Sequence, residues 1–210
     1  MTAFGFVAVV LWIVGQVVAA TMSDSLSDKA TDDQVLAWVQ GNANPILAGG
    51  WLFMIGCIAF VCFAAMLRSR LASADGPEGT LARIAFGGAL AAAIFGMLTQ
   101  GGDIDAAINK DDISAGTAGT LHHLGDAAFV CVELSAILLV GSVAVLGWRT
   151  GVVPKWWAAF CAIVGVVLVI GPIGWLGVII GIPIFTIGSG LLLRGPVAVR
   201  STAHATVATG

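Results

Sequence analysis

Long apolar stretches are the feature that most constrains what this chain can fold into. Each is close to the 17–25 residues that a helix needs to cross the hydrocarbon core of a bilayer. They cover residues 3–20, 46–67, 81–100, 121–147, 156–171 and 174–193. Backbone N–H and C=O groups find no water in the bilayer core, so they must form hydrogen bonds within the segment. We therefore expect each stretch to be an α-helix. The sequence predicts an all-α, polytopic membrane helix bundle with six transmembrane helices in one domain, residues 1–194, followed by a disordered cytoplasmic tail, 195–210.

The last two predicted spans come from one almost uninterrupted apolar run. Residues 156–193 number 38 and would form a helix of about 57 Å, against a hydrocarbon core of about 30 Å. The sequence Gly171-Pro172-Ile173-Gly174 supplies a turn signal near the middle of this run. We therefore expect a tight helical hairpin with Pro172 at the outer surface.

Lysine and arginine are distributed unequally between the predicted loops. With the N-terminus inside, seven cations fall on the cytoplasmic side and only Lys29 and Lys110 lie outside. Cytoplasmic loops carry the excess of Lys and Arg in membrane proteins. We expect both termini to be cytoplasmic, and the acidic loops 21–44 and 101–118 to be extracellular in a multi-pass protein of the plasma membrane.

The amino-acid composition and net charge of the chain limit the kinds of molecule that it can bind. Hydrophobic residues make up 59% of the chain and charged residues 10%, as is typical of an integral membrane protein. The net charge of −3 offers no basic surface for nucleic acid. The lipid bilayer is the expected partner, with a homo-oligomer or a second membrane protein as open alternatives. No nucleotide-binding motif is found, and the placement of the histidines excludes bis-histidine haem.

A capping signal precedes the second span. Thr31-Asp32-Asp33-Gln34 has the pattern of a capping box, and apolar residues follow as far as Gly41. The pattern predicts a short surface helix that ends at Gly41. Its apolar side indicates that it lies on the outer membrane face or covers the outer mouth of the bundle.

Three ionisable residues share one face of the fourth span. With His122 at zero, Asp126 falls at about 40° and Glu133 at about 20°, while His123 lies about 100° away. Such groups at membrane depth usually face a protein interior or a wet cavity. Gln16, Gln100 and Asp103 are expected at similar depths. The sequence predicts a polar chamber in the outer half of the bundle.

Three interpretations of this chamber remain open. The first is non-enzymatic binding, sensing or conduction of protons or a small solute, with Glu133, His122 and Asp126 as a relay. The second is a divalent-metal site on His122 and Asp126, completed by His123 or acidic residues, that serves a membrane enzyme. The third is a structural network within this protein or with a partner subunit. We favour the first, without catalysis.

Glycines recur along the last span. Gly174, Gly181 and Gly188 are seven residues apart, and Gly177 lies beside them. Small residues allow helices to approach closely in a membrane, so these glycines predict a packing seam. Pro183 should kink the same helix.

Three landmarks carry a resemblance to a known family. They are Asn44-Pro45 opening the second span, Arg83 entering the third, and the loop from Arg149 through Pro154 and Lys155 to Trp156. Over residues 44–193 the chain resembles six-helix bacterial integral membrane proteins of unknown function, common in actinobacteria. The resemblance implies no established activity, and the residues of the fourth span are not carried over from it.

Overall fold

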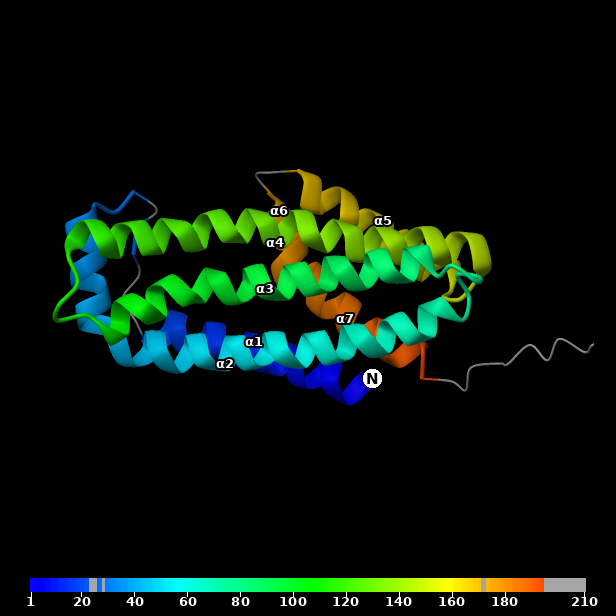
Figure 1. Cartoon of the computed structure of the whole chain (residues 1–210), viewed down its shortest axis with the longest axis horizontal. Helices are drawn as coiled ribbons and strands as arrows, with labels where there is room; N and C mark the ends of the chain where they lie inside the picture. Colours follow the sequence, from blue (N-terminus) through cyan, green and yellow to red (C-terminus); the bar gives the residue numbers. More distant parts are fainter. Residues whose placement is uncertain (23–25, 28, 171–172, 195–210) are drawn as a thin grey trace, which may run out of the picture.

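The computed structural model describes residues 1–22, 26–27, 29–170 and 173–194, which form a bundle of helices with a shared long axis (Figure 1). The first four helices along the chain are α1 (Thr2–Met22), α2 (Asp32–Ala72), α3 (Thr80–Ile108) and α4 (Ala115–Thr150). After α5 (Lys155–Val169), the chain ends in one helical stretch of three parts, α6 (Gly174–Leu176), the π-helical η2 (Gly177–Gly181) and α7 (Ile182–Leu192). The predicted all-α class is confirmed for these residues. The predicted Gly171-Pro172 turn and the tail 195–210 lie outside them.

Most of these helices have the length and composition of membrane spans. Five of them, α1 to α4 and the stretch Gly174–Leu192, are long and apolar enough to cross a bilayer, whereas α5 is shorter at 15 residues. At 1.5 Å per residue α5 measures about 22 Å. The helix α5 therefore covers only part of α4, which has 36 residues, and α6 begins near the middle of α4 (Figure 1).

The start of α2 departs from the expected separate helix. The capping box is present, since Gln34 Oε1 accepts from the Thr31 amide at 2.9 Å and Thr31 Oγ1 accepts from the Gln34 amide at 3.4 Å. The helix does not end at Gly41. It bends at Asn42, which leaves helical geometry, and continues through Pro45. The Asn42 side chain donates to the Trp38 carbonyl at 2.9 Å, and this bond holds the two segments together across the bend.

The segment before the bend, residues 32–41, crosses the ends of α3 and α4 (Figure 1). It is held there by a small apolar cluster, separate from the main core. The cluster consists of Val35, Val39, Ala43, Ile46, Ala106, Ala107 and Ala118. The predicted capping helix thus becomes the bent first part of α2.

The main core fills the opposite half of the bundle, between α2, α3, α4, α5 and α7. Its large members are nearly or fully buried: Phe60, Phe63, Leu67, Leu71, Leu139, Val140, Val143, Leu146 and Phe185. At the same end, Thr2 Oγ1 donates to the Gly190 carbonyl at 2.7 Å, and Arg194 Nε donates to Thr2 Oγ1 at 2.8 Å. These bonds tie the beginning of α1 to the end of α7.

Glycines line the contact between the C-terminal helical stretch and α5. A methyl group at Gly177 would lie 2.7 Å from Leu168, one at Gly181 would lie 2.8 Å from Val164, and Gly188 faces the Trp157 indole. The π turn comes directly before Pro183, where the Ile182 amide bonds the Gly177 carbonyl five residues back. Close packing on α5 and a wide turn at Pro183 therefore occur together.

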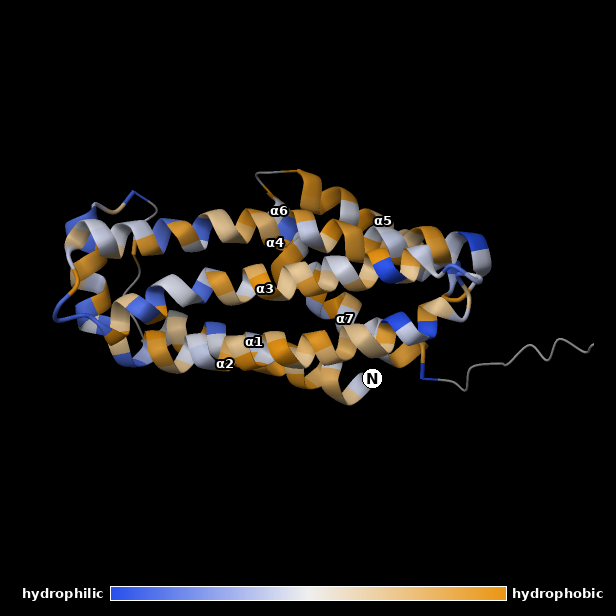
Figure 2. Cartoon of the chain, viewed as in Figure 1, coloured by the Kyte–Doolittle hydropathy of each residue, from blue (hydrophilic) through white to orange (hydrophobic). Residues whose placement is uncertain are grey.

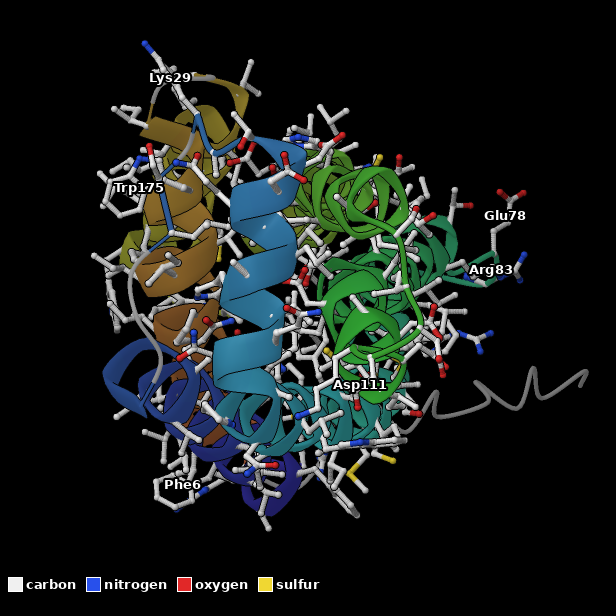
Figure 3. All side chains as sticks on the ribbon, turned by 90° about the vertical axis from the view of Figure 1, so that its left-hand side faces the viewer. Phe6, Lys29, Glu78, Arg83, Asp111 and Trp175 are labelled. Carbon is white, nitrogen blue, oxygen red and sulfur yellow. The ribbon has the colours of Figure 1, made fainter. Side chains whose placement is uncertain are left out.

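The sides of the bundle are apolar, and its ends are polar (Figure 2). Phe6 on α1 is 57% exposed and Trp175 on α6 is 47% exposed, and both point outward (Figure 3). Similar exposed side chains occur on α2 to α5, among them Ile58 and Ile163. Contiguous exposed apolar surface of this extent is unusual for a soluble monomer and is compatible with a multi-pass membrane protein.

Candidate functional site

A cavity of about 570 Å³ lies between α1, α2, α3, α4 and the η2–α7 stretch. Its volume is in the range of small-molecule pockets. The beginning of α1 packs on α7, where Thr2 bonds the Gly190 carbonyl and a methyl group at Gly5 would lie 3.1 Å from Thr186. The inner part of the cavity borders the main core, because Phe60, Leu139 and Ile182 belong to both.

The two ends of the cavity differ in chemistry. Polar side chains line the end nearer the α3–α4 connection: Gln16, Thr99, Gln100, Asp103, His122 and Asp126. Aromatic and aliphatic side chains line the rest, including Trp12, Phe53, Phe60, Phe129, Leu139 and Ile182. The cavity thus combines a hydrogen-bonding end with a long apolar interior.

His122 and Asp103 form the best-defined polar contact in the cavity. His122 Nδ1 lies 2.9 Å from Asp103 Oδ1, and both side chains are mostly buried. An ionised carboxylate only accepts hydrogen bonds, so Nδ1 carries the proton and Nε2 of a neutral ring is an acceptor. The Trp38 ring packs edge-on against His122 with centroids 5.8 Å apart. Together, Asp103 and Trp38 fix the orientation of the imidazole.

His123 and Asp126 form a second, looser pair at the rim. His123 Nδ1 lies 3.5 Å from Asp126 Oδ2, and the side chains are 58% and 70% exposed. Asp126 lines the cavity, whereas His123 is not among its lining residues. Water screens such an exposed pair, so it contributes little to stability. The Asp126 carboxylate remains accessible to a cation that enters the cavity.

Glu133 is separated from the other ionisable residues of α4. It is only 8% exposed and does not line the cavity. A methyl group at Gly174 would lie 2.7 Å from its Oε1, so the carboxylate packs against the start of α6. Among the described residues, no hydrogen bond joins Glu133 to Gln16, Gln100 or any other side chain. The start of α6 thus occupies the position of Glu133 on the same face of α4 as His122 and Asp126.

The polar residues form pairs and not a metal cluster. Within the described part of the chain, no three His, Cys, Asp or Glu side chains are placed to hold one ion. His122 pairs with Asp103, and His123 pairs with Asp126. The arrangement gives no support to a divalent-metal site on His122 and Asp126, which stays a prediction.

Several cavity residues were absent from the sequence prediction. Trp12, Phe53 and Phe129 lie in apolar spans, where nothing in the local pattern distinguishes a cavity wall from a lipid-facing residue. Trp38 does not line the cavity but contacts the lining residue His122, and it belongs to a segment that the sequence predicts to be a separate surface helix. Only the three-dimensional arrangement of the helices reveals these roles.

Comparison of the chain with protein-family models, curated proteins and solved structures gives no match. The resemblance to six-helix bacterial membrane proteins therefore stays a prediction. The site has to be interpreted from its own chemistry.

Proposed function

We propose that this chain is a six-spanning protein of the bacterial plasma membrane that binds a small solute in a chamber facing the outside, without catalysing a reaction. Both termini then lie in the cytoplasm. Support comes from charge, because Arg68, Arg83, Arg149, Lys155 and Arg194 belong to loops and helix ends at one end of the bundle. Lys110 lies at the other end, in an acidic connection that includes Asp111 and Asp112.

One observation supports binding over conduction: the cavity is polar at its outer end and closed by packed apolar side chains at its inner end. Phe60, Leu139 and Ile182 line the inner part. Beyond them, Phe63 and Phe185 are fully buried in the main core. A proton or ion crossing this region would find no polar partner among these side chains, and an unpaired charge in an apolar interior is very unfavourable. The chamber suits binding or sensing.

Thermal unfolding of the purified protein with a panel of solutes tests this proposal. The panel contains amines, amino acids, sugars, organic acids and divalent cations. A solute that binds the folded state raises the unfolding temperature by mass action. Val132→Trp fills the chamber, because Val132 lines it, and Leu134→Trp places the same ring on the outer surface, where Leu134 is 58% exposed.

We expect at least one solute class to stabilise the wild type and Leu134→Trp, and to have no effect on Val132→Trp. Equal effects on both variants, or no effect of any solute, would rule out the chamber as a binding site for hydrophilic solutes. Proteoliposomes should pass protons no faster than empty liposomes. A proton flux clearly above that of empty liposomes would mean that the protein conducts protons, and the proposal of a binding chamber would be wrong.

A further inference from the structure

We infer that the ligand of the chamber is a single-chain cationic amphiphile, a long-chain amine or alkylammonium that enters sideways between α1 and the η2–α7 stretch. This inference rests on the proposed binding function and specifies its ligand. Three independent properties of the cavity carry it: its charge, its shape and its opening.

The charge of the cavity wall selects the headgroup. Asp103 and Asp126 both line the polar end, and Gln16 and Gln100 add amide oxygens. No Lys or Arg is found among the described residues of the lining. Asp103 is paired with His122, and Asp126 is paired with the exposed His123. An ammonium group that approaches the polar end can form charge-assisted contacts with the Asp126 carboxylate and with the free oxygen of Asp103.

The shape of the cavity selects the chain. Lining residues run from Asp103 to Ala92 on α3 and from His122 to Leu139 on α4, which corresponds to lengths of about 16 and 26 Å. A volume of about 570 Å³ spread over such a length leaves a narrow cross-section. One unbranched chain fits this space, and its burial against aromatic and aliphatic side chains is favourable.

The opening of the cavity points to entry from the bilayer. The helices α1 and α7 touch near their inner ends, where Thr2 bonds Gly190. Further out, Ile13 and Val17 of α1 and Ile179 of η2 all line the cavity, yet they are 50–59% exposed. The same side chains therefore face both the cavity and the apolar outer surface. A chain dissolved in the membrane can pass between them while its headgroup stays at the polar end.

Photo-crosslinking in lipid nanodiscs tests this inference. The probe is an alkyltrimethylammonium with a diazirine near the end of its chain, and the labelled residues are mapped by mass spectrometry. We expect labelling at the deep lining residues Ala136, Leu139 and Ile182. We expect dodecyltrimethylammonium to compete, and dodecyl sulfate, dodecanol and tetramethylammonium to compete at least about tenfold less well. Labelling confined to outward residues such as Leu134 and Leu138 would overturn the inference.

Charge variants provide the matched control. Asp103→Asn should weaken competition by dodecyltrimethylammonium about tenfold, and Asp126→Asn, at the exposed rim, about two- to fivefold. Asp111→Asn removes the same charge from the α3–α4 loop, outside the cavity, and should leave competition unchanged (Figure 3). If Asp103→Asn does not fold, the exposed Asp126 still gives the test. Equal effects of Asp111→Asn and Asp126→Asn on competition would show that only the general negative surface charge attracts the cation. That result would overturn the inference.

The two proposals fail in different ways. If hydrophilic solutes stabilise the wild type but not Val132→Trp, and the alkylammonium does not label the cavity, the chamber binds a different ligand and the inference on amphiphiles is wrong. If tetramethylammonium competes as well as its dodecyl analogue, the chamber recognises the cation alone and the inference is again wrong. If neither small solutes nor the amphiphile bind, both proposals fall.

Discussion

Two histidine–aspartate pairs at the polar end of the cavity differ in a way that can be measured. The His122–Asp103 pair is short at 2.9 Å and mostly buried, whereas the His123–Asp126 pair is 3.5 Å long and exposed. We predict a coupling energy of about 1–3 kcal/mol for the buried pair and well below about 1 kcal/mol for the exposed one. Double-mutant cycles with Ala and Asn replacements, followed by unfolding in detergent, give both values. Equal coupling in the two pairs would contradict the geometry.

Glu133 gives the second prediction at the residue scale. Glu133 is only 8% exposed, and its carboxylate has no hydrogen-bond partner among the described residues, so much of its hydration is lost without replacement, which is unfavourable for a charged or polar group. Glu133→Met should therefore raise the free energy of unfolding by about 1 kcal/mol or more, while Glu133→Gln, which keeps a buried polar group, should gain less. An increase in the free energy of unfolding would indicate that the Glu133 carboxylate is kept for function although it lowers stability. Destabilisation by Glu133→Met would instead reveal a partner.

Among the helices, the contact between α3 and α4 depends on glycine. A methyl group at Gly88 would lie 2.7 Å from the Ser135 carbonyl oxygen and 2.8 Å from the Leu139 amide, whereas one at Gly87 meets nothing within 4 Å. Gly88→Ala must push the backbones apart and should destabilise the protein by about 1–3 kcal/mol. Gly87→Ala should be neutral or slightly stabilising, because alanine favours the helix. A similar effect of the two neighbouring changes would mean that α3 faces α4 differently.

The helices themselves were largely predictable from the sequence, and their ends were not. Apolar runs locate all six segments, because span length and composition are local properties. Asn42 gives no local signal that the capping helix and the second span merge, since the bend is stabilised by packing against α3 and α4. The short α5 is likewise hidden in the run from 156 to 193. Consequently His122, Asp103 and Asp126 could be proposed as one site, but the contact of Glu133 with the start of α6 could not.

For the whole molecule, orientation in the membrane is the first testable property. The uneven placement of cations predicts that the α2–α3 loop is cytoplasmic and that the segment before α2 is external. In a background without cysteine, Ser27→Cys should react with an impermeant thiol reagent on intact cells, and Ser73→Cys should react only after the membrane is opened. Both serines are exposed, so access to solvent does not bias the comparison. The reverse pattern would invert the proposed topology.

The central claim is that a chamber open to the outside lies between these helices, and a cysteine scan along α3 tests it most directly. Gly96 and Thr99 line the cavity, whereas Ile94 and Leu98 are exposed on the apolar outer surface and do not line it. In intact cells without other cysteines, an impermeant cationic thiol reagent should modify Gly96→Cys and Thr99→Cys and leave Ile94→Cys and Leu98→Cys unmodified. Modification of neither lining position, or of all four alike, would contradict the chamber.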